Sequence, residues 1–136
     1  MDYISKSLRK TENLAAKFLA ENPDVRLIGL VGDLGSGKSA FVKGAAKFLG
    51  VRKNVTSPTF VIMKNYEVKN KKLIHIDAYR LENIKDLESL GFNELLIDEN
   101  NLVIIEWPEK VFIEFPQAMK IVKFKYINDE TRQISF

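Results

Sequence analysis

The apolar residues of the chain form two kinds of pattern, short continuous runs and stripes with helical spacing. Residues 25–31 and 102–106 are almost uninterrupted apolar runs. Runs of this length without polar alternation are typical of strands buried on both faces, as in a parallel sheet. We therefore predict that both segments are central strands.

Stripes of apolar residues predict three helices, over residues 11–20, 40–49 and 83–90. Each stripe repeats at intervals of three or four residues, which places its apolar side chains on one face. The expected termini are marked by Thr11 and Asn83 as N-caps and by Gly50 and Gly91 at the ends of helices.

Four further segments, at residues 59–68, 73–77, 118–126 and 131–136, have the composition of strands. Asn70 and its neighbouring lysines supply a turn, so the first two should form a hairpin. The apolar positions of the third change parity, which suggests a bulge. Strands interleaved with helices predict an α/β fold, a single domain over residues 1–136 whose largely parallel central sheet is flanked by helices and has some antiparallel strands.

The chemistry of the chain is indicated by residues 32–39, which read Gly-Asp-Leu-Gly-Ser-Gly-Lys-Ser. This is the phosphate-binding loop pattern G-x-x-x-x-G-K-[ST], and it lies between a predicted strand and a predicted helix. The glycines let backbone N–H groups turn toward a phosphate chain, and the helix N-terminus adds its dipole. Lys38 is expected on the β and γ phosphates of ATP or ADP, and the Ser39 hydroxyl on Mg²⁺. The fold is therefore predicted to be P-loop NTPase-like.

Hydrolysis also needs acidic groups, and two predicted strands end in one. Asp77 follows the run Leu-Ile-His-Ile, and Glu106 follows Val-Ile-Ile. Carboxylates at the carboxyl ends of parallel strands suit Mg²⁺ and the orientation of water. Each acid alone would equally fit a helix cap or an ion pair with arginine. Together with the loop, both are assigned as metal-site and catalytic candidates.

Three neighbouring features are less specific. His75 shares a strand face with Asp77, and it suits either a buried structural histidine or a partner of the metal-site acids. Residues 56–60, Thr-Ser-Pro-Thr-Phe, suit a γ-phosphate sensor or an ordinary entry into a strand. Trp107 beside Glu106 suits either the core or contact with a nucleotide or partner.

Composition narrows the setting. The 136 residues are 46% hydrophobic, and 21 basic against 18 acidic residues give a net charge of +3. The lack of cysteine excludes disulfides and thiolate metal sites and fits a cytoplasmic protein. We expect no membrane segment, because apolar runs are short and residues 1–10 are polar and mixed. The lysines around Asn70 are better explained by a solvated turn than by nucleic acid.

Five segments, in order, closely resemble the bacterial tRNA threonylcarbamoyladenosine biosynthesis ATPase family (TsaE, formerly YjeE). They are residues 32–39, 57–60, 75–81, 90–92 and 106–109. The resemblance implies a small ATPase that acts with a TsaB–TsaD protein complex. That complex transfers threonylcarbamoyl to the adenosine beside the anticodon of ANN-decoding tRNAs, and the ATPase is expected to reset it between turnovers. Contact with tRNA is then expected to be indirect.

The resemblance also implies roles for individual residues. It places Lys38 on the phosphates, Ser39 and Glu106 on the metal, and Asp77 on the attacking water or, indirectly, on the metal. The expected nucleotide contacts are Thr11, Asp33, Gly35, Ser36, Gly37, Lys38, Ser39, Ala40, Trp107 and Arg132. The family commonly has two threonines where this chain has Ser39 and Ala40. Serine keeps the hydroxyl ligand, whereas Ala40 loses a contact to the α-phosphate.

Two other functions remain open. A small-molecule kinase shares the loop but needs an acceptor pocket and an arginine-bearing lid, and the chain has only five arginines. A nucleotide-sensing binding module would use ATP to order residues 56–60, with hydrolysis incidental. Arg80 and Arg132 are the two candidates for an arginine that speeds hydrolysis, and turnover of the isolated protein is expected to be slow.

Overall fold

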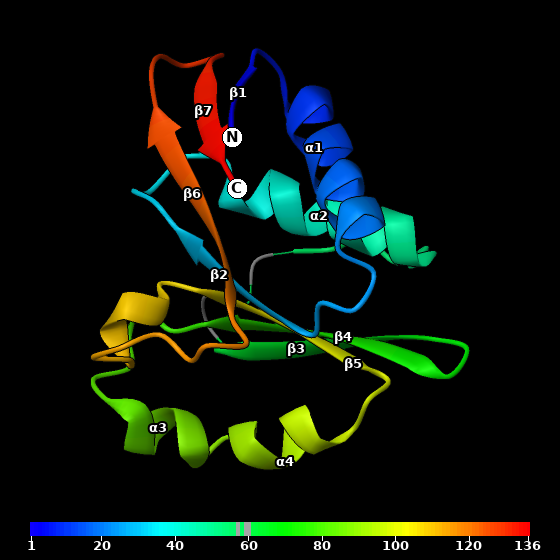
Figure 1. Cartoon of the computed structure of the whole chain (residues 1–136), viewed down its shortest axis with the longest axis vertical. Coiled ribbons are helices and arrows are strands. Elements are labelled where there is room, and N and C mark those ends of the chain that lie inside the picture. Colours follow the sequence, from blue (N-terminus) through cyan, green and yellow to red (C-terminus); the bar gives the residue numbers. More distant parts are fainter. Residues whose placement is uncertain (57, 59–60) are drawn as a thin grey trace.

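The computed structural model describes residues 1–56, 58 and 61–136, and its elements alternate between strands and helices (Figure 1). The strands are β1 (Asp2–Ser5), β2 (Leu27–Val31), β3 (Met63–Val68), β4 (Lys71–Asp77), β5 (Asn101–Glu106), β6 (Lys120–Tyr126) and β7 (Arg132–Ser135). The helices are α1 (Leu8–Glu21), α2 (Lys38–Leu49), α3 (Ile84–Glu88) and α4 (Phe92–Ile97), with a 3-10 turn η1 (Pro108–Lys110).

These strands form one sheet with the order β1-β7-β6-β2-β5-β4-β3. The four central strands, β6, β2, β5 and β4, run parallel, while β7, β1 and β3 are added antiparallel at the edges. The predicted α/β fold with a largely parallel centre is therefore confirmed. The carboxyl ends of β2, β4 and β5 meet at one edge of the sheet, where a ligand is expected in this architecture.

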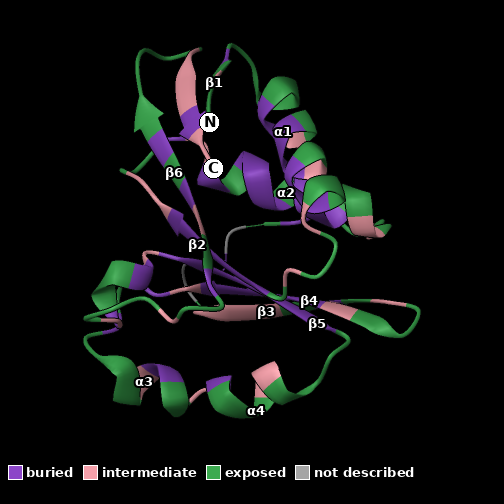
Figure 2. Ribbon diagram, viewed as in Figure 1, coloured by how far each residue is buried: buried purple, intermediate pink, exposed green. Residues whose placement is uncertain are grey.

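The helices cover the sheet in two layers, α1 and α2 on one face and α3 and α4 on the other (Figure 1). Every residue of β5 is buried. Leu102 and Ile104 pack in the cluster that includes α1 and α2, whereas Val103 and Ile105 pack in the cluster that includes α3 and α4. Figure 2 shows the buried residues following the central strands. Burial on both faces explains the continuous apolar run in the sequence.

Several sequence predictions need correction. Ser7, not Thr11, is the N-cap of α1, and its side chain accepts a hydrogen bond from Lys10 N at 3.0 Å. Thr11 lies inside the helix and is 2% exposed. The hairpin is confirmed, but β3 begins at Met63, and residues 61–62 form a turn. Residues 59 and 60 of the predicted strand lie outside the described residues.

Other differences concern short elements. β1 and α4 were not predicted, and Gly91, expected to end a helix, is the N-cap of α4 with a φ of 84°. Asn83 caps α3 as predicted, through a hydrogen bond from Asp86 N. The bulge expected in residues 118–126 is absent from the described pairing, because β6 pairs continuously with β2 and then with β7. Within the described part of the chain, every helix is too short or too polar to cross a membrane.

The contact between α1 and α2 generates a stability prediction. A Cβ on Gly44 would lie 2.3 Å from the backbone oxygen of Glu12, so the helices pack backbone to backbone at this point. Gly44→Ala should lower the free energy of unfolding by about 1–3 kcal/mol, although alanine favours helices, because the helices are forced apart. Urea denaturation measures this change.

The control is Lys43→Ala, at an exposed position of the same helix. It should change the free energy of unfolding by no more than about 0.5 kcal/mol. Equal stability of Gly44→Ala and the wild type would contradict this account of the helix contact.

Candidate functional site

The loop formed by residues 32–37 connects the end of β2 to the start of α2. Gly35 and Gly37 have φ values of 74° and 104°, in the left-handed region that favours glycine. Gly37 is also the N-cap of α2 and carries no capping side chain, so the first N–H groups of that helix lack a side-chain cap. The backbone therefore has the form that the sequence motif requires for an anion cradle.

Ser36 provides an independent indication that a polar ligand belongs in this loop. Its hydroxyl is buried and has no hydrogen-bond partner among the described residues. Buried hydroxyls without a partner are uncommon and call for an explanation. A phosphate oxygen within hydrogen-bond distance would supply the missing partner.

Lys38, the first residue of α2, folds back over the loop. Its ammonium donates to the backbone carbonyl of Gly32, donates more weakly to that of Asp33 at 3.4 Å, and lies 3.8 Å from the centre of the Trp107 ring. Burial lowers the pKa of Lys38, and the nearby carboxylates, led by Glu106, partly oppose this shift.

The register of the sheet brings the two acids together. Asp77, the last residue of β4, pairs with Glu106, the last residue of β5. Glu106 also pairs with Leu30 at the end of β2. The two carboxylates predicted from separate strands therefore lie side by side, next to the loop that follows β2.

Glu106 is held by a buried histidine. His75 Nε2 and Glu106 Oε2 are 2.6 Å apart, and the two residues are 1% and 5% exposed. When Glu106 is a carboxylate, His75 Nε2 carries a hydrogen and donates a hydrogen bond to Glu106 Oε2. His75 Nδ1 has no partner among the described residues. Of the two roles considered for His75, the contact supports that of a partner of Glu106.

Trp107 lies between the loop and the surface. Its backbone has φ 60° and ψ 48°, unusual for an aromatic residue, and its N–H donates to Leu30 O at 3.2 Å. Tyr79 packs edge-on against its ring, with centroids 5.0 Å apart. Sequence reasoning did not identify Tyr79, although it lies two residues after Asp77 within a segment quoted for the family resemblance.

A cavity of about 370 Å³ lies at the carboxyl edge of the sheet, among the loop, Lys38, the two acids and Trp107. Its lining consists of Leu34, Gly35, Ser36, Gly37, Lys38, Ser39, Asp77, Glu106 and Trp107. The cavity thus brings together the loop, the cation and both acids that the sequence predicted separately.

Four predicted nucleotide contacts lie outside that lining. Arg132 Nε donates to Gly35 O at 2.9 Å, so this arginine braces the loop. The methyl group of Thr11 lies 4.0 Å from where a Cβ of Gly37 would be, but its hydroxyl faces Ser5 Oγ at 2.7 Å. Asp33 contacts Lys38 through its backbone, as noted above, and Ala40 is buried in the first turn of α2.

The donor set fits Mg²⁺ better than a softer metal. Ser39, Asp77 and Glu106 offer oxygen atoms, which hard cations prefer. Among the described residues, no group of three or more His, Cys, Asp and Glu side chains is arranged to hold a metal ion. A site with few protein ligands suits Mg²⁺, which keeps several waters and also takes phosphate oxygens.

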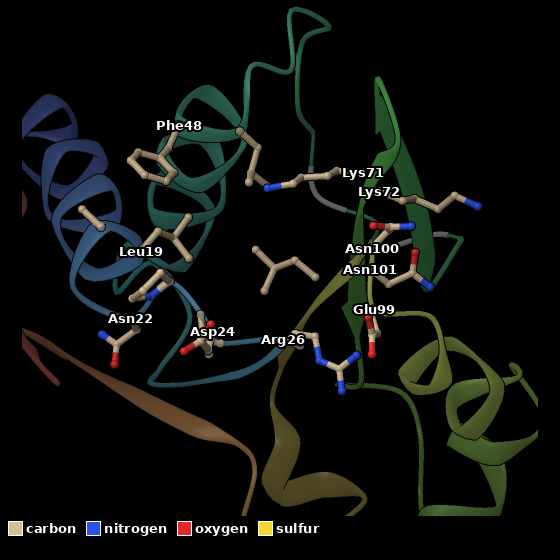
Figure 3. Close-up of a pocket in the computed structure, with 15 residues that line it drawn as sticks. Leu19, Asn22, Asp24, Arg26, Phe48, Lys71, Lys72, Glu99, Asn100 and Asn101 are labelled. Carbon is tan, nitrogen blue, oxygen red and sulfur yellow. The ribbon is translucent and has the colours of Figure 1, made fainter.

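Two other regions carry less information about chemistry. A cavity of about 560 Å³ opens at the opposite edge of the sheet, near Arg26, Lys71 and Asn101 (Figure 3), and contains none of the predicted site residues. In the segment 56–60, Thr56 Oγ1 accepts from Lys64 Nζ. Residues 57, 59 and 60 lie outside the described residues, so the sensor prediction stays a prediction.

Comparisons with known proteins agree on one family. The model of "Threonylcarbamoyl adenosine biosynthesis protein TsaE" matches residues 5–134. The tRNA threonylcarbamoyladenosine biosynthesis protein TsaE of Borreliella burgdorferi is 39% identical, covering 76% of this chain and 75% of its own. The proteins of that name from Bacillus subtilis and Rickettsia bellii are 36% and 33% identical, covering 81% and 95% of this chain and 68% and 89% of their own. The crystal structure of Bacillus subtilis YdiB aligns with a TM-score of 0.75 at 28% identity, covering 98% of this chain and 82% of its own.

The buried pair of His75 and Glu106 generates the prediction from this geometry. His75→Leu leaves the Glu106 carboxylate buried without its donor, which should lower the free energy of unfolding by about 3 kcal/mol at neutral pH. His75→Gln places an amide N–H where Nε2 lies and should cost about 1 kcal/mol. Urea denaturation of both variants measures the difference.

Both substitutions change the shape of the side chain, but only His75→Gln keeps a hydrogen-bond donor. A difference in stability between the two variants therefore reports on the hydrogen bond rather than on packing. If His75→Leu is as stable as His75→Gln, the donor from residue 75 does not hold Glu106. The contact would then be incidental.

Proposed function

The chain belongs to the TsaE family of threonylcarbamoyl adenosine biosynthesis proteins, and we propose that it is the Mg²⁺-dependent ATPase of tRNA threonylcarbamoyladenosine modification. The observation that carries the proposal is the cavity in which the loop 32–37, Lys38 and two strand-end carboxylates converge. A cation, a ring of backbone donors and adjacent acids are the groups that phosphoryl transfer to water requires.

Nucleotide binding follows from the loop and α2. The N–H groups of residues 35 and 37–39 and the Ser36 hydroxyl would donate to phosphate oxygens, and the helix dipole of α2 would favour the negative charge of the phosphates. Lys38 would exchange its carbonyl acceptors, Gly32 and Asp33, for the β and γ phosphates. Trp107 lines one side of the cavity, with its ring against the lysine.

Ser39, Glu106 and Asp77 are the proposed holders of Mg²⁺. When bound, the ion neutralises charge that develops on the transferred phosphoryl group. His75 fixes one oxygen of Glu106, and Tyr79 N donates to Asp77 Oδ1 at 3.0 Å, so neither carboxylate rotates freely. Asp77, on which the family resemblance places the attacking water, would orient that water and receive its proton.

The proposed setting is the cytoplasm, with a TsaB–TsaD complex as partner and indirect contact with tRNA. Arg132 is bonded to Gly35 O, Asn128 O and Thr131 O, and it braces the loop rather than entering the cavity lined by Lys38. Slow hydrolysis by the isolated protein fits this placement of Arg132, because an arginine pointed at the γ-phosphate accelerates such reactions strongly.

Amide and alanine substitutions test the proposed chemistry. Lys38→Ala should abolish both Mg·ATP binding and hydrolysis. Asp77→Asn and Glu106→Gln should reduce single-turnover hydrolysis about 100-fold or more while retaining binding, because they remove charge without removing bulk. Calorimetry measures binding, and release of phosphate measures hydrolysis.

The control is Glu99→Gln, which changes an exposed acid just before the start of β5, at the end of the strand away from Glu106. This variant should behave as the wild type. Unchanged affinity and hydrolysis in Lys38→Ala would refute the proposal. A Glu106→Gln protein that sustains repeated rounds of tRNA modification would favour the nucleotide-sensing module over the ATPase.

Lys38 also sets an expected pH dependence. Burial lowers its pKa in the free protein, whereas bound phosphates would raise it again. At a pH between the pKa of Lys38 in the free protein and its pKa in the bound protein, nucleotide binding takes up one proton. The affinity for Mg·ADP should therefore fall as pH rises, by up to about tenfold per pH unit. At a pH below the lowered pKa, Lys38 is charged in both the free and the nucleotide-bound protein, and it then makes no contribution to the dependence of affinity on pH.

Calorimetry in two buffers of different ionisation enthalpy measures this proton uptake. Lys38→Arg is the control, since guanidinium stays charged throughout the range and should remove the uptake even where affinity is lower. Equal uptake by the arginine variant would assign the proton to another group.

A further inference from the structure

A second concave surface, which we call the acidic groove, lies beside the proposed ATP site. It has a volume of about 820 Å³ and runs between residues 82–84, at the start of α3, and residues 109–115, which begin in η1. Figure 1 shows α3 and η1 at the same end of the sheet, where the central parallel strands finish. The groove and the nucleotide cavity are therefore neighbours.

The groove exposes large apolar side chains. Ile113 is fully exposed, and Ile84 and Phe115 are 37% and 39% exposed. Phe112 and Val111 complete the apolar lining. Isolated exposed apolar residues are normal, but several that line one groove mark a surface that a partner covers.

The charged residues that line the groove indicate which kind of partner it can bind. The lining includes three carboxylates, those of Glu82, Glu109 and Glu114, against one ammonium, that of Lys110. The chain as a whole carries a net charge of +3, so this surface is opposite in sign to the molecule. Phosphates of a nucleic acid would be repelled here. A protein segment that combines apolar side chains with lysine or arginine would be complementary.

A row of groups in contact connects the groove to Lys38. Lys110 Nζ lies 5.0 Å from the centre of the Tyr79 ring, and Tyr79 packs edge-on against Trp107 at 5.0 Å. The opposite end of the row is Lys38, whose ammonium lies 3.8 Å from the Trp107 ring. A group that binds Lys110 or displaces Tyr79 from the groove side therefore acts on the residue that holds Lys38.

We propose that the acidic groove binds a basic, amphipathic segment of the partner complex, and that the row Lys110–Tyr79–Trp107 couples this binding to the nucleotide site. The inference rests on the proposed function, because it takes the TsaB–TsaD complex as the partner. It adds the surface, the chemistry of the segment and the route by which the partner alters nucleotide affinity.

Charge reversal tests the docking surface. Glu82→Lys/Glu114→Lys should weaken binding of the purified TsaB–TsaD complex of the same organism at least tenfold, and binding of the wild type should weaken with salt. Both residues are exposed and outside the nucleotide cavity, so Mg·ADP affinity of the isolated variant should be unchanged. The control, Glu67→Lys/Glu99→Lys, makes the same charge change at exposed positions elsewhere and should bind within about twofold of wild type.

Truncation tests the apolar part. Ile113→Ser should weaken partner binding about tenfold without loss of stability, because this side chain is fully exposed in the isolated protein. Ile97→Ser, at a 78% exposed position in α4 outside the groove, is the matched control and should have no effect.

The outcomes separate this inference from the proposed function. If the wild type binds the complex and the groove variants bind equally well, the acidic groove is not the docking surface, and the proposed function stands. If the wild type does not bind the complex at all, both the partner assignment and this inference fail.

Coupling has its own test. Reciprocity requires that a partner which changes Mg·ADP affinity is itself bound differently in the presence of Mg·ADP. Tyr79→Leu removes the ring between Lys110 and Trp107 but keeps the backbone N–H from which Asp77 accepts a hydrogen bond. This variant should still bind the partner. The mutual effect, by which the partner and Mg·ADP change each other's affinity, should be mostly lost. The same mutual effect in Tyr79→Leu as in wild type, or none in wild type, would overturn the proposed route.

Discussion

The parallel pairing of β2, β5 and β4 is the constraint on which the rest of the molecule depends. Strands that are parallel and in register finish at the same level, so Leu30, Asp77 and Glu106 end up adjacent although they are far apart in sequence. The loop after β2 then faces both acids without any further arrangement. A shift of one residue in β4 or β5 would point its carboxylate to the opposite face and exchange the side chains that pack on the two faces of the sheet. The packing of both faces of the sheet therefore fixes the geometry of the site.

Burial of Glu106 is the main energetic consequence of that arrangement. A carboxylate at the end of a fully buried strand loses most of its hydration, which is tolerated when a donor replaces water. His75 on the neighbouring strand provides that donor, and the oppositely charged Lys38 faces the same cavity. A site of this kind keeps charges close together in a poorly hydrated space, where each interacts more strongly with a ligand than it would in water.

The sequence predicted the parts of the molecule that are encoded locally. Continuous apolar runs identified β2 and β5, and the glycine pattern located the loop between β2 and α2. β1 could not be predicted, because its four residues are held by antiparallel pairing with β7 at the other end of the chain. Thr11 was mistaken for a cap because it suits that position, whereas the helix extends back to Ser7.

In the site, the separate residue types were predictable but their contacts were not. Asp77 and Glu106 each mark the end of an apolar run, yet only the strand order makes them neighbours. The hydrogen bond between His75 and Glu106 and the contact of Tyr79 with Trp107 both join residues from different segments of the chain. A pattern along one strand carries information about which face a side chain occupies, and no information about what lies opposite on the next strand. The contacts between strands had to come from the structure.

The position of Lys38 in the free protein bears on how such a site is regulated. Its ammonium is already satisfied by the Gly32 and Asp33 carbonyls and by the Trp107 ring, and Trp107 itself has a backbone conformation that aromatic residues rarely adopt. Under the proposed function a nucleotide would replace these contacts, so the free energy of breaking them would subtract from the free energy of nucleotide binding. Any change that moves Trp107 alters that difference without touching the phosphates. Because the Trp107 ring is held from the surface side by Tyr79, the affinity of the proposed nucleotide site would be open to adjustment from outside the cavity.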